Sequence, residues 1–303
     1  MHDALAGTRA LLLDMDGVLV ARGRPIPGAP GAIARLRAAG IPFRVITNIS
    51  LSSRSSLSRR LASGGIDIPA EQIVTALSAA VEEVAAAGSG QAVYLLGSAE
   101  APAEFAGADV RLLTDADVDR GASADVVVIG DSEDRLSYEN LNRAFRLLRR
   151  GARFVAMHRN PWWFTPAGPT LDSGAFVAGL EFATGRRATV AGKPSPAVFR
   201  AALHELATNA AAGARLLRRD VAMVGDDLRA DLAPARRLGL RTVLVLTGRH
   251  GEEELATSRR GGRARILPDA VAPSIVEVAG AFAIPVSAEA AHGVTGARAE
   301  TRE

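Results

Sequence analysis

The sequence of 303 residues contains no cysteine and only one lysine, and both absences restrict its chemistry. Without cysteine the chain has no disulfide bond, no thiolate zinc site and no cysteine nucleophile, whereas metal sites built from oxygen ligands remain open. Lysine and arginine together number 36, so arginine carries almost all of the positive charge. The net charge is only +3, and the arginine pairs are typical of solvated helix ends, so nucleic acid is not an expected partner.

Long apolar runs are also missing. No run approaches the roughly 20 residues that a membrane span requires, so we expect no membrane association. The first residues lack the basic head and the small-residue cleavage site of a signal peptide, and we expect a cytoplasmic protein. A dinucleotide-binding fingerprint is absent as well, because Gly88-Ser89-Gly90 precedes a predicted strand instead of following one. A nicotinamide or flavin enzyme is therefore disfavoured.

Short apolar runs alternate with amphipathic stretches along the chain, a pattern that predicts a parallel sheet with helices on its faces. We interpret four of the runs as buried strands: residues 11–13, 43–46, 221–224 and 242–246. Between the first two, residues 29–39 show helical spacing and are followed by Gly40 as a helix stop. The sequence therefore indicates an α/β fold.

The middle of the chain repeats this alternation with strands of its own, at residues 92–96, 110–113, 125–129 and 154–157. Ser137 is expected to cap a helix that ends at Gly151. We predict that residues 80–186 form a second α/β unit, inserted into a domain made of residues 1–79 and 187–285. Residues 286–303 show no sustained apolar period and are expected to be a disordered tail.

Two aspartates follow the first predicted strand, in Asp14-Met15-Asp16. Parallel sheets bind ligands at the carboxyl ends of their strands, so both side chains are expected at a binding site. A carboxylate at position 14 could attack phosphorus and split one displacement into two easier steps. Asp16 could protonate the leaving oxygen and later deprotonate water. The alternative is a strand that simply ends in an Asp-Gly turn.

Polar residues follow the second predicted strand, beginning with Thr47 and Asn48. Thr47 and Asn48 are predicted to hold phosphoryl oxygens, with helix-start amides nearby, although Ser, Thr and Asn at such positions often only cap a helix. Lys193, the single lysine, lies in a turn rich in proline ahead of a predicted helix around residues 198–206. Its ammonium could neutralise a transferring phosphoryl group, and the alternative is an exposed turn lysine.

Acidic residues also follow the third predicted strand, in Gly225-Asp226-Asp227 and then Asp231. Carboxylates beside a phosphate require a compensating cation, and hard oxygen ligands suit Mg²⁺. We predict that Asp226 binds Mg²⁺ together with Asp14 and the backbone carbonyl of Asp16. Asp227 and Asp231 are predicted to support the site. The alternative is a solvated acidic turn.

Taken in order, these features resemble the four motifs of the haloacid dehalogenase superfamily: Asp-x-Asp, then Thr or Ser, then Lys, then Gly-Asp followed by another acid. Here they are Asp14-Met15-Asp16, Thr47, Lys193, and Gly225-Asp226 with Asp231. The resemblance implies a Rossmann-like parallel-sheet core with an inserted α/β cap domain. It also implies a metal-dependent phosphatase.

The insert between Thr47 and Lys193 is similar to the cap of the branch that contains p-nitrophenyl phosphatase-like and phosphoglycolate phosphatase-like enzymes. Residues 138–148 and 190–194 further resemble the phospholysine phosphohistidine inorganic pyrophosphate phosphatase-like subgroup. Caps of this branch often form dimers, so a homodimer is expected. The chain departs from the subgroup in two places: Asp16 stands where serine is frequent, and residues 172–175 replace a Gly-Pro-Gly-Pro run.

The cap contains three further candidates. Asp172 could recognise a cationic or hydroxylated substrate, but we interpret it as a turn aspartate beside Gly174. The aromatic run Trp162-Trp163-Phe164 could stack on a leaving group, but we favour packing in an interface or in the cap's own core. His158, at a predicted strand end, is interpreted as structural.

We therefore predict Mg²⁺-dependent hydrolysis of small phosphate monoesters or pyrophosphate through an aspartyl-phosphate on Asp14. One alternative is a phosphotransferase or mutase that shares the first step. Another is a non-catalytic phosphate-binding regulatory module. A receiver domain is rejected because its acidic residues would all precede the Thr and Lys, whereas Asp226 follows Lys193.

Overall fold

The computed structural model describes residues 2–132, 134–165, 168–208, 216–249, 253, 255–256 and 267–282. The strands are β1 (Ala10–Asp14), β2 (Val20–Ala21), β3 (Arg24–Pro25), β4 (Phe43–Thr47), β5 (Ile73–Thr75), β6 (Gln91–Leu96), β7 (Val110–Leu113), β8 (Val126–Ile129), β9 (Arg153–Ala156), β10 (Trp162–Thr165), β11 (Gly168–Leu171), β12 (Thr189–Val190), β13 (Val221–Gly225), β14 (Arg241–Val245) and β15 (Ala270–Ala272).

The helices are α1 (His2–Leu5), α2 (Ala29–Ala38), α3 (Arg54–Ser63), α4 (Ala76–Ala85), α5 (Ala101–Phe105), α6 (Asp115–Asp119), α7 (Tyr138–Arg149), α8 (Ser173–Thr184), α9 (Pro196–Thr208), α10 (Ala233–Arg237) and α12 (Ile275–Gly280). Short turns of 3₁₀ helix, η1 (Ala70–Gln72) and η2 (Arg218–Asp220), and of π helix, η3 (Leu228–Leu232), complete the described elements.

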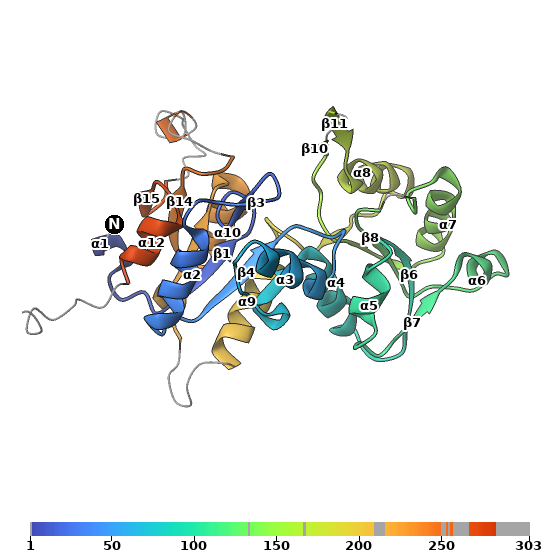
Figure 1. Ribbon diagram of the computed structural model, residues 1–303. Helices are drawn as coiled ribbons and strands as arrows, with labels where there is room; N and C mark the ends of the chain where they lie inside the picture. The colour runs from blue at the N-terminus through green and yellow to red at the C-terminus, as the bar shows by residue number, and fades with distance from the viewer. Residues whose placement is uncertain are drawn as a thin grey trace, which may run out of the picture.

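A six-stranded parallel sheet forms the first lobe, in the order β15-β14-β13-β1-β4-β5. Along β1, Leu11 and Leu13 pack on one face with α2, α3 and α12, whereas Leu12 packs on the other face with α4, α9 and α10. Helices cover both faces, so every residue of β1 is buried, and the strand is apolar up to its last residue, Asp14 (Figure 1).

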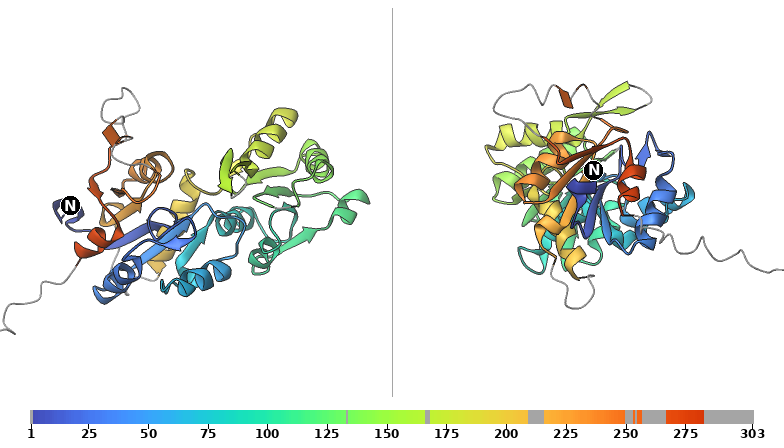
Figure 2. Two further views of the ribbon diagram at one scale, coloured as in Figure 1. Left: turned by 45° about the horizontal axis from the view of Figure 1, so that its top comes forward. Right: turned by 90° about the vertical axis from the view of Figure 1, so that its left-hand side faces the viewer.

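A five-stranded parallel sheet forms the second lobe, in the order β12-β9-β8-β6-β7. Figures 1 and 2 show the two lobes side by side, with α4 at their junction. Residues of α4 share one apolar cluster with strands of both sheets. The predicted boundary at residue 80 falls inside this helix, and β12, which we assigned to the first domain, pairs with β9 of the second sheet.

Every predicted strand is present, and each end agrees with the prediction to within one residue. The predicted helix caps are also confirmed where they are described: the Ser137 side chain accepts a hydrogen bond from Asn140 N at the start of α7. The α/β fold is therefore confirmed. Among the described helices, none has the length and apolar character needed to cross a membrane. The predicted tail, residues 286–303, lies outside the described residues.

Candidate functional site

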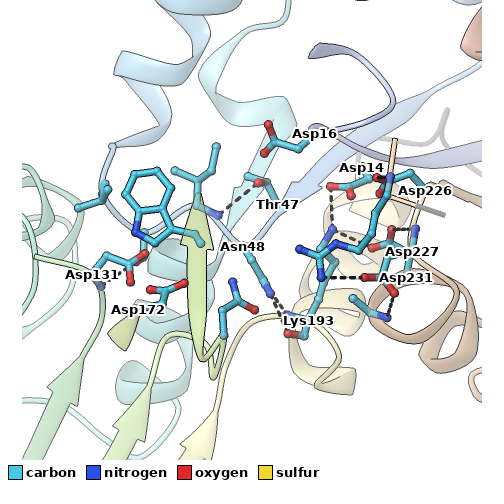
Figure 3. Close-up of a pocket in the computed structure, with 17 residues that line it drawn as sticks. Asp14, Asp16, Thr47, Asn48, Asp131, Asp172, Lys193, Asp226, Asp227 and Asp231 are labelled. Atoms are coloured by element: carbon cyan, nitrogen blue, oxygen red, sulfur yellow. Dashed lines mark hydrogen bonds and ion pairs between the residues drawn. The ribbon is translucent and has the colours of Figure 1, made fainter. Parts of the chain in front are cut away.

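The predicted site residues come together at the carboxyl ends of three neighbouring strands. Asp14 is the last residue of β1, Thr47 is the last residue of β4, and Asp226 directly follows β13. The chain runs from β1 to β4 through α2 on one face of the sheet and from β13 to β14 through α10 on the other face. The connections therefore diverge between β1 and β13, which opens a crevice at this edge. A pocket of about 300 Å³ lies there, and all three side chains line it (Figure 3).

Lys193 reaches this crevice from the turn ahead of α9 and contacts two carboxylates. Its Nζ lies 2.7 Å from Asp14 Oδ1 and 2.8 Å from Asp231 Oδ1. The Lys193 side chain is 5% exposed and Asp231 is fully buried. Burial alone would lower the lysine pKa, but the two carboxylates raise it above its usual value. The single lysine is therefore a buried cation and not an exposed turn residue.

Asn48 fixes the backbone around Lys193. The Asn48 amide donates to Lys193 O at 2.9 Å, and its Oδ1 accepts from Lys193 N at 2.7 Å. Gly192 permits this approach, because a Cβ there would overlap Asn48 Oδ1. Both bonds run to backbone, so the structure gives Asn48 a positioning contact that the sequence did not suggest. Thr47 is buried, and its Oγ1 accepts from Ile49 N at 3.2 Å.

Three carboxylates lie together beside the lysine. Oxygens of Asp14, Asp226 and Asp231 are all within 4.8 Å of one another. Burial, followed by repulsion from neighbouring carboxylates, raises the pKa of Asp226 to about 6 and that of Asp231 to about 7. Burial also raises the pKa of Asp14 to about 6, although Lys193 opposes the shift. One ammonium does not compensate for this much buried negative charge.

The donor set fits a divalent metal ion. All three side chains offer hard oxygen atoms of the kind that bind Mg²⁺, and a cation would offset their repulsion. Two glycines shape the cluster, because a Cβ at Gly17 or at Gly248 would overlap the carboxylate of Asp226. The sequence predicted only a supporting role for Asp231, whereas the structure places its carboxylate directly beside those of the predicted ligands Asp14 and Asp226. The predicted Asp16 carbonyl remains a prediction.

The remaining acids of the core differ in their surroundings. Asp16 lines the pocket with an exposed side chain, and its pKa is raised because the surrounding protein displaces water. Asp227 caps η3, where its Oδ1 accepts from Arg229 N at 2.8 Å and from Ala230 N at 2.9 Å. Arg249 was not predicted as a site residue: its backbone N donates to Asp226 Oδ2 at 2.5 Å, and the residue lines the pocket.

The cap supplies the opposite wall of the pocket. Asp131, Asp172 and Trp163 all line it. Asp172 is the N-cap of α8, and its side chain is only 5% exposed, so it is a buried helix cap and not a solvated turn residue. The structure contradicts one of our two preferred interpretations of the aromatic run, that the tryptophans pack in the cap's own core. Trp162 is 50% exposed and Trp163 is 47% exposed, because β10 and β11 form a hairpin away from the cap core.

Asp131 was not predicted as a site residue, although its position after a buried strand could have indicated it. It follows β8 after one glycine, much as Asp226 follows β13. The pattern of an acid at the carboxyl end of a buried parallel strand therefore occurs in both sheets, and we applied it only to the first. His158, which we interpreted as structural, is 1% exposed and contacts Asp131.

The sequence profile of a family described as haloacid dehalogenase-like hydrolase matches residues 11–111, and a second profile of the same kind matches residues 190–278. A bovine (Bos taurus) haloacid dehalogenase-like hydrolase domain-containing protein 2 is 34% identical over 245 residues, which cover 80% of this chain and 85% of that protein. The phospholysine phosphohistidine inorganic pyrophosphate phosphatase of Homo sapiens is 33% identical over 251 residues, covering 81% and 85%.

Solved structures agree with these relatives. A p-nitrophenyl phosphatase from Archaeoglobus fulgidus superposes with a TM-score of 0.80 at 28% identity, covering 90% of this chain and 99% of that one. A glycerol phosphate phosphatase from Mycobacterium tuberculosis in complex with magnesium gives a TM-score of 0.77 at 26% identity, covering 92% and 78%. These matches confirm the superfamily and the branch that the sequence motifs predicted.

Proposed function

This chain belongs to the haloacid dehalogenase-like hydrolases and is a phosphatase, and we propose that it hydrolyses small phosphate monoesters or pyrophosphate through an aspartyl-phosphate on Asp14. The observation that carries the proposal is the environment of Asp14: a buried carboxylate at a strand end, 2.7 Å from the only lysine and beside two further acids. This arrangement restrains a nucleophile and surrounds it with the groups that a phosphoryl transfer requires.

In the first step, a carboxylate oxygen of Asp14 attacks phosphorus, and the bond between phosphorus and the leaving oxygen breaks. Lys193 orients the carboxylate and attracts the negative charge of the phosphoryl group. Asn48 keeps the lysine in position through its backbone, and the Thr47 hydroxyl is proposed to bind a phosphoryl oxygen. Asp16 donates its proton to the leaving oxygen, a role that its raised pKa favours.

In the second step, Asp16 accepts a proton from water, and the resulting oxygen attacks the phosphorus of the aspartyl-phosphate. The bond from phosphorus to Asp14 breaks, which releases inorganic phosphate and restores the carboxylate. We propose that Asp14, Asp226 and the Asp16 carbonyl hold Mg²⁺, with Asp231 supporting them. A bound Mg²⁺ would supply the positive charge that Lys193 alone does not.

The proposal is tested by phosphate release from a panel of small phosphate esters and pyrophosphate, with Mg²⁺ or with chelator. Release that requires the metal and is lost in Asp14→Asn is expected, and circular dichroism should show that the variant remains folded, because Lys193 keeps its ion pair with Asp231. If Asp14→Asn keeps substantial Mg²⁺-dependent activity, the nucleophile assignment is wrong.

Product analysis separates the alternatives on the same fold. A phosphotransferase or mutase would pass the phosphoryl group to an acceptor other than water. The product would then be the phosphorylated acceptor, and inorganic phosphate would not accumulate. A non-catalytic regulatory module would bind phosphate without turnover. A cytoplasmic location and a homodimer remain predictions of the sequence, and sedimentation of the purified protein tests the second.

A further inference from the structure

Charge is unevenly distributed along the pocket. Figure 3 shows Asp14, Asp226 and Asp231 at one end and Asp131 with Asp172 at the other, with Thr47 and Lys193 between them. The described cations that line the pocket, Lys193 and Arg249, both contact acids of the core end. At the cap end, the described lining residues include no lysine or arginine. A phosphate fits the core end, whereas the cap end is suited to a group of opposite charge.

The two acids of the cap end are held in place by a buried histidine and by the core. His158 Nε2 lies 2.8 Å from Asp131 Oδ2 and 4.0 Å from Asp172 Oδ1. Ser50, three residues after Thr47, donates from its hydroxyl to the same Asp131 oxygen at 2.8 Å. Asp131 and Asp172 also contact each other: burial, followed by the contact with the Asp131 carboxyl group, raises the pKa of Asp172 to about 7. A cationic group bound beside the two acids would relieve their repulsion.

The histidine's hydrogen bonds argue against a second metal ion here, although the three side chains are close enough for one. Asn160 N donates to His158 Nδ1 at 3.3 Å, which requires that nitrogen to be unprotonated. The ring proton then resides on Nε2, which donates to Asp131. A histidine ligand needs the opposite arrangement, in which the nitrogen that faces the metal carries no proton.

An aromatic face completes this end of the pocket. The Trp163 indole lines it and is 47% exposed, so it is available to a ligand. An indole face attracts organic cations, and carboxylates accept charge-assisted hydrogen bonds from them. The carboxylates would repel a phosphate. A neutral sugar could stack on the indole and donate its hydroxyls to the carboxylates, but only a cation adds charge attraction to both the ring face and the acids. The combination of aromatic and acidic side chains therefore favours an alkylammonium group.

We propose that Asp131, Asp172 and Trp163 form a subsite that binds an ammonium group on the leaving group of the substrate. The inference rests on the proposed function, because it assumes that the phosphate occupies the core end. It identifies the substrate class as small phosphate esters of amino alcohols, since a pocket of about 300 Å³ suits a small molecule. Asp172 and Trp163 are then specificity-determining residues, and His158 is a positioning residue.

A matched pair of esters tests the subsite. O-phosphoethanolamine and n-propyl phosphate differ mainly in whether the chain ends in an ammonium or a methyl group. The expected ratio of their kcat/KM values is at least about tenfold in favour of the ammonium ester. Asp172→Asn, which still caps a helix, and Trp163→Leu should both lower this ratio toward one. Asp134→Asn removes an exposed cap acid that does not line this pocket and should leave the ratio unchanged.

Binding to the Asp14→Asn protein, measured by titration calorimetry with each ester, separates this inference from the proposed function. A Kd about tenfold lower for the ammonium ester supports the subsite even if no ester is hydrolysed. If the wild type hydrolyses n-propyl phosphate and the ammonium ester with equal kcat/KM values, the subsite is wrong and the phosphatase proposal stands. A ratio that Asp172→Asn and Trp163→Leu do not change would also overturn it.

Discussion

Lys193 is the residue on which most of the buried charge in the core depends. Its ammonium contacts Asp14 and Asp231, and the Asp14, Lys193 and Asp231 side chains are each less than 10% exposed. Removing one partner of a buried ion pair costs far more than the pair itself contributes, because the remaining charge has lost its compensation. The structure therefore makes this position sensitive for stability as well as for turnover.

We predict that Lys193→Met lowers the free energy of unfolding by about 3 kcal/mol at pH 8 in chelator. Without the lysine, the folded-state pKa values of both carboxyl groups rise further above their unfolded values. A carboxyl group with a raised folded-state pKa destabilises the folded protein increasingly as pH rises through that pKa. The loss in free energy of unfolding should therefore shrink toward pH 5, where the carboxyl groups of the folded protein are protonated. Urea unfolding at the two pH values measures it.

Arg120→Met is the matched control for this experiment. Arg120 is 71% exposed and pairs with Asp117 on the cap surface, so its removal should cause no comparable loss and no such pH dependence. A loss for Lys193→Met that is small, or that is equal at both pH values, would contradict the assignment of Lys193 as a buried counter-ion.

At the scale of single elements, α8 positions the acidic wall of the pocket. Asp172 caps the helix, and Gly174 in its first turn packs against the backbone at residues 159–160. Gly174 N donates to Asn160 O at 3.1 Å, and a Cβ at Gly174 would overlap that oxygen. The glycine is thus needed for close approach between the helix start and the segment that carries His158.

We predict that Gly174→Ala destabilises the protein by about 1–3 kcal/mol, because backbone atoms must shift to make room for the methyl group. Gly179→Ala in the same helix is the control. A Cβ at Gly179 meets no atom within 4 Å, so alanine should be neutral or stabilise the helix by about 0.5–1 kcal/mol. Thermal unfolding of the two variants distinguishes them, and equal effects would show that the packing at residue 174 is unimportant.

At the scale of the whole molecule, the two sheets share a core. The cluster that contains Leu12 of β1 and Val198 of α9 also contains Val128 of β8 and Met157, which follows β9, and α4 connects them. Polar contacts add to this junction: Ser53 N donates to Glu100 Oε2 at 2.8 Å, and Ser50 contacts Asp131. A continuous apolar cluster couples the unfolding of the lobes that it joins.

We predict one cooperative unfolding transition for the full chain. Both tryptophans lie in β10 of the cap, so their fluorescence reports on that lobe, whereas far-ultraviolet circular dichroism reports on both. The two signals should share one urea midpoint. An earlier fluorescence midpoint would show that the cap unfolds independently and that the shared cluster does not couple the lobes.

Local pattern was sufficient to predict the strands and the catalytic motifs. Buried parallel strands are continuous apolar runs, and polar residues directly after such runs stand out, as Asp14 and Asp226 do. Helix stops and caps such as Gly40 and Ser137 are equally local. Edge strands such as β12 and β15 are only two or three residues long and carry too little pattern to detect.

The long-range arrangement of side chains was decided only by folding. No spacing in the sequence indicates that Lys193 bridges Asp14 and Asp231, or that Asn48 binds the lysine backbone. The contacts of Lys193 with Asp14 and Asn48 each join segments more than a hundred residues apart, and Asp231 comes from a different element. The cap wall is similar: Asp131 and Asp172 come from different elements and meet through His158. Periodicity records which residues are buried, whereas the packing of one sheet against the other determines which of them face the same pocket.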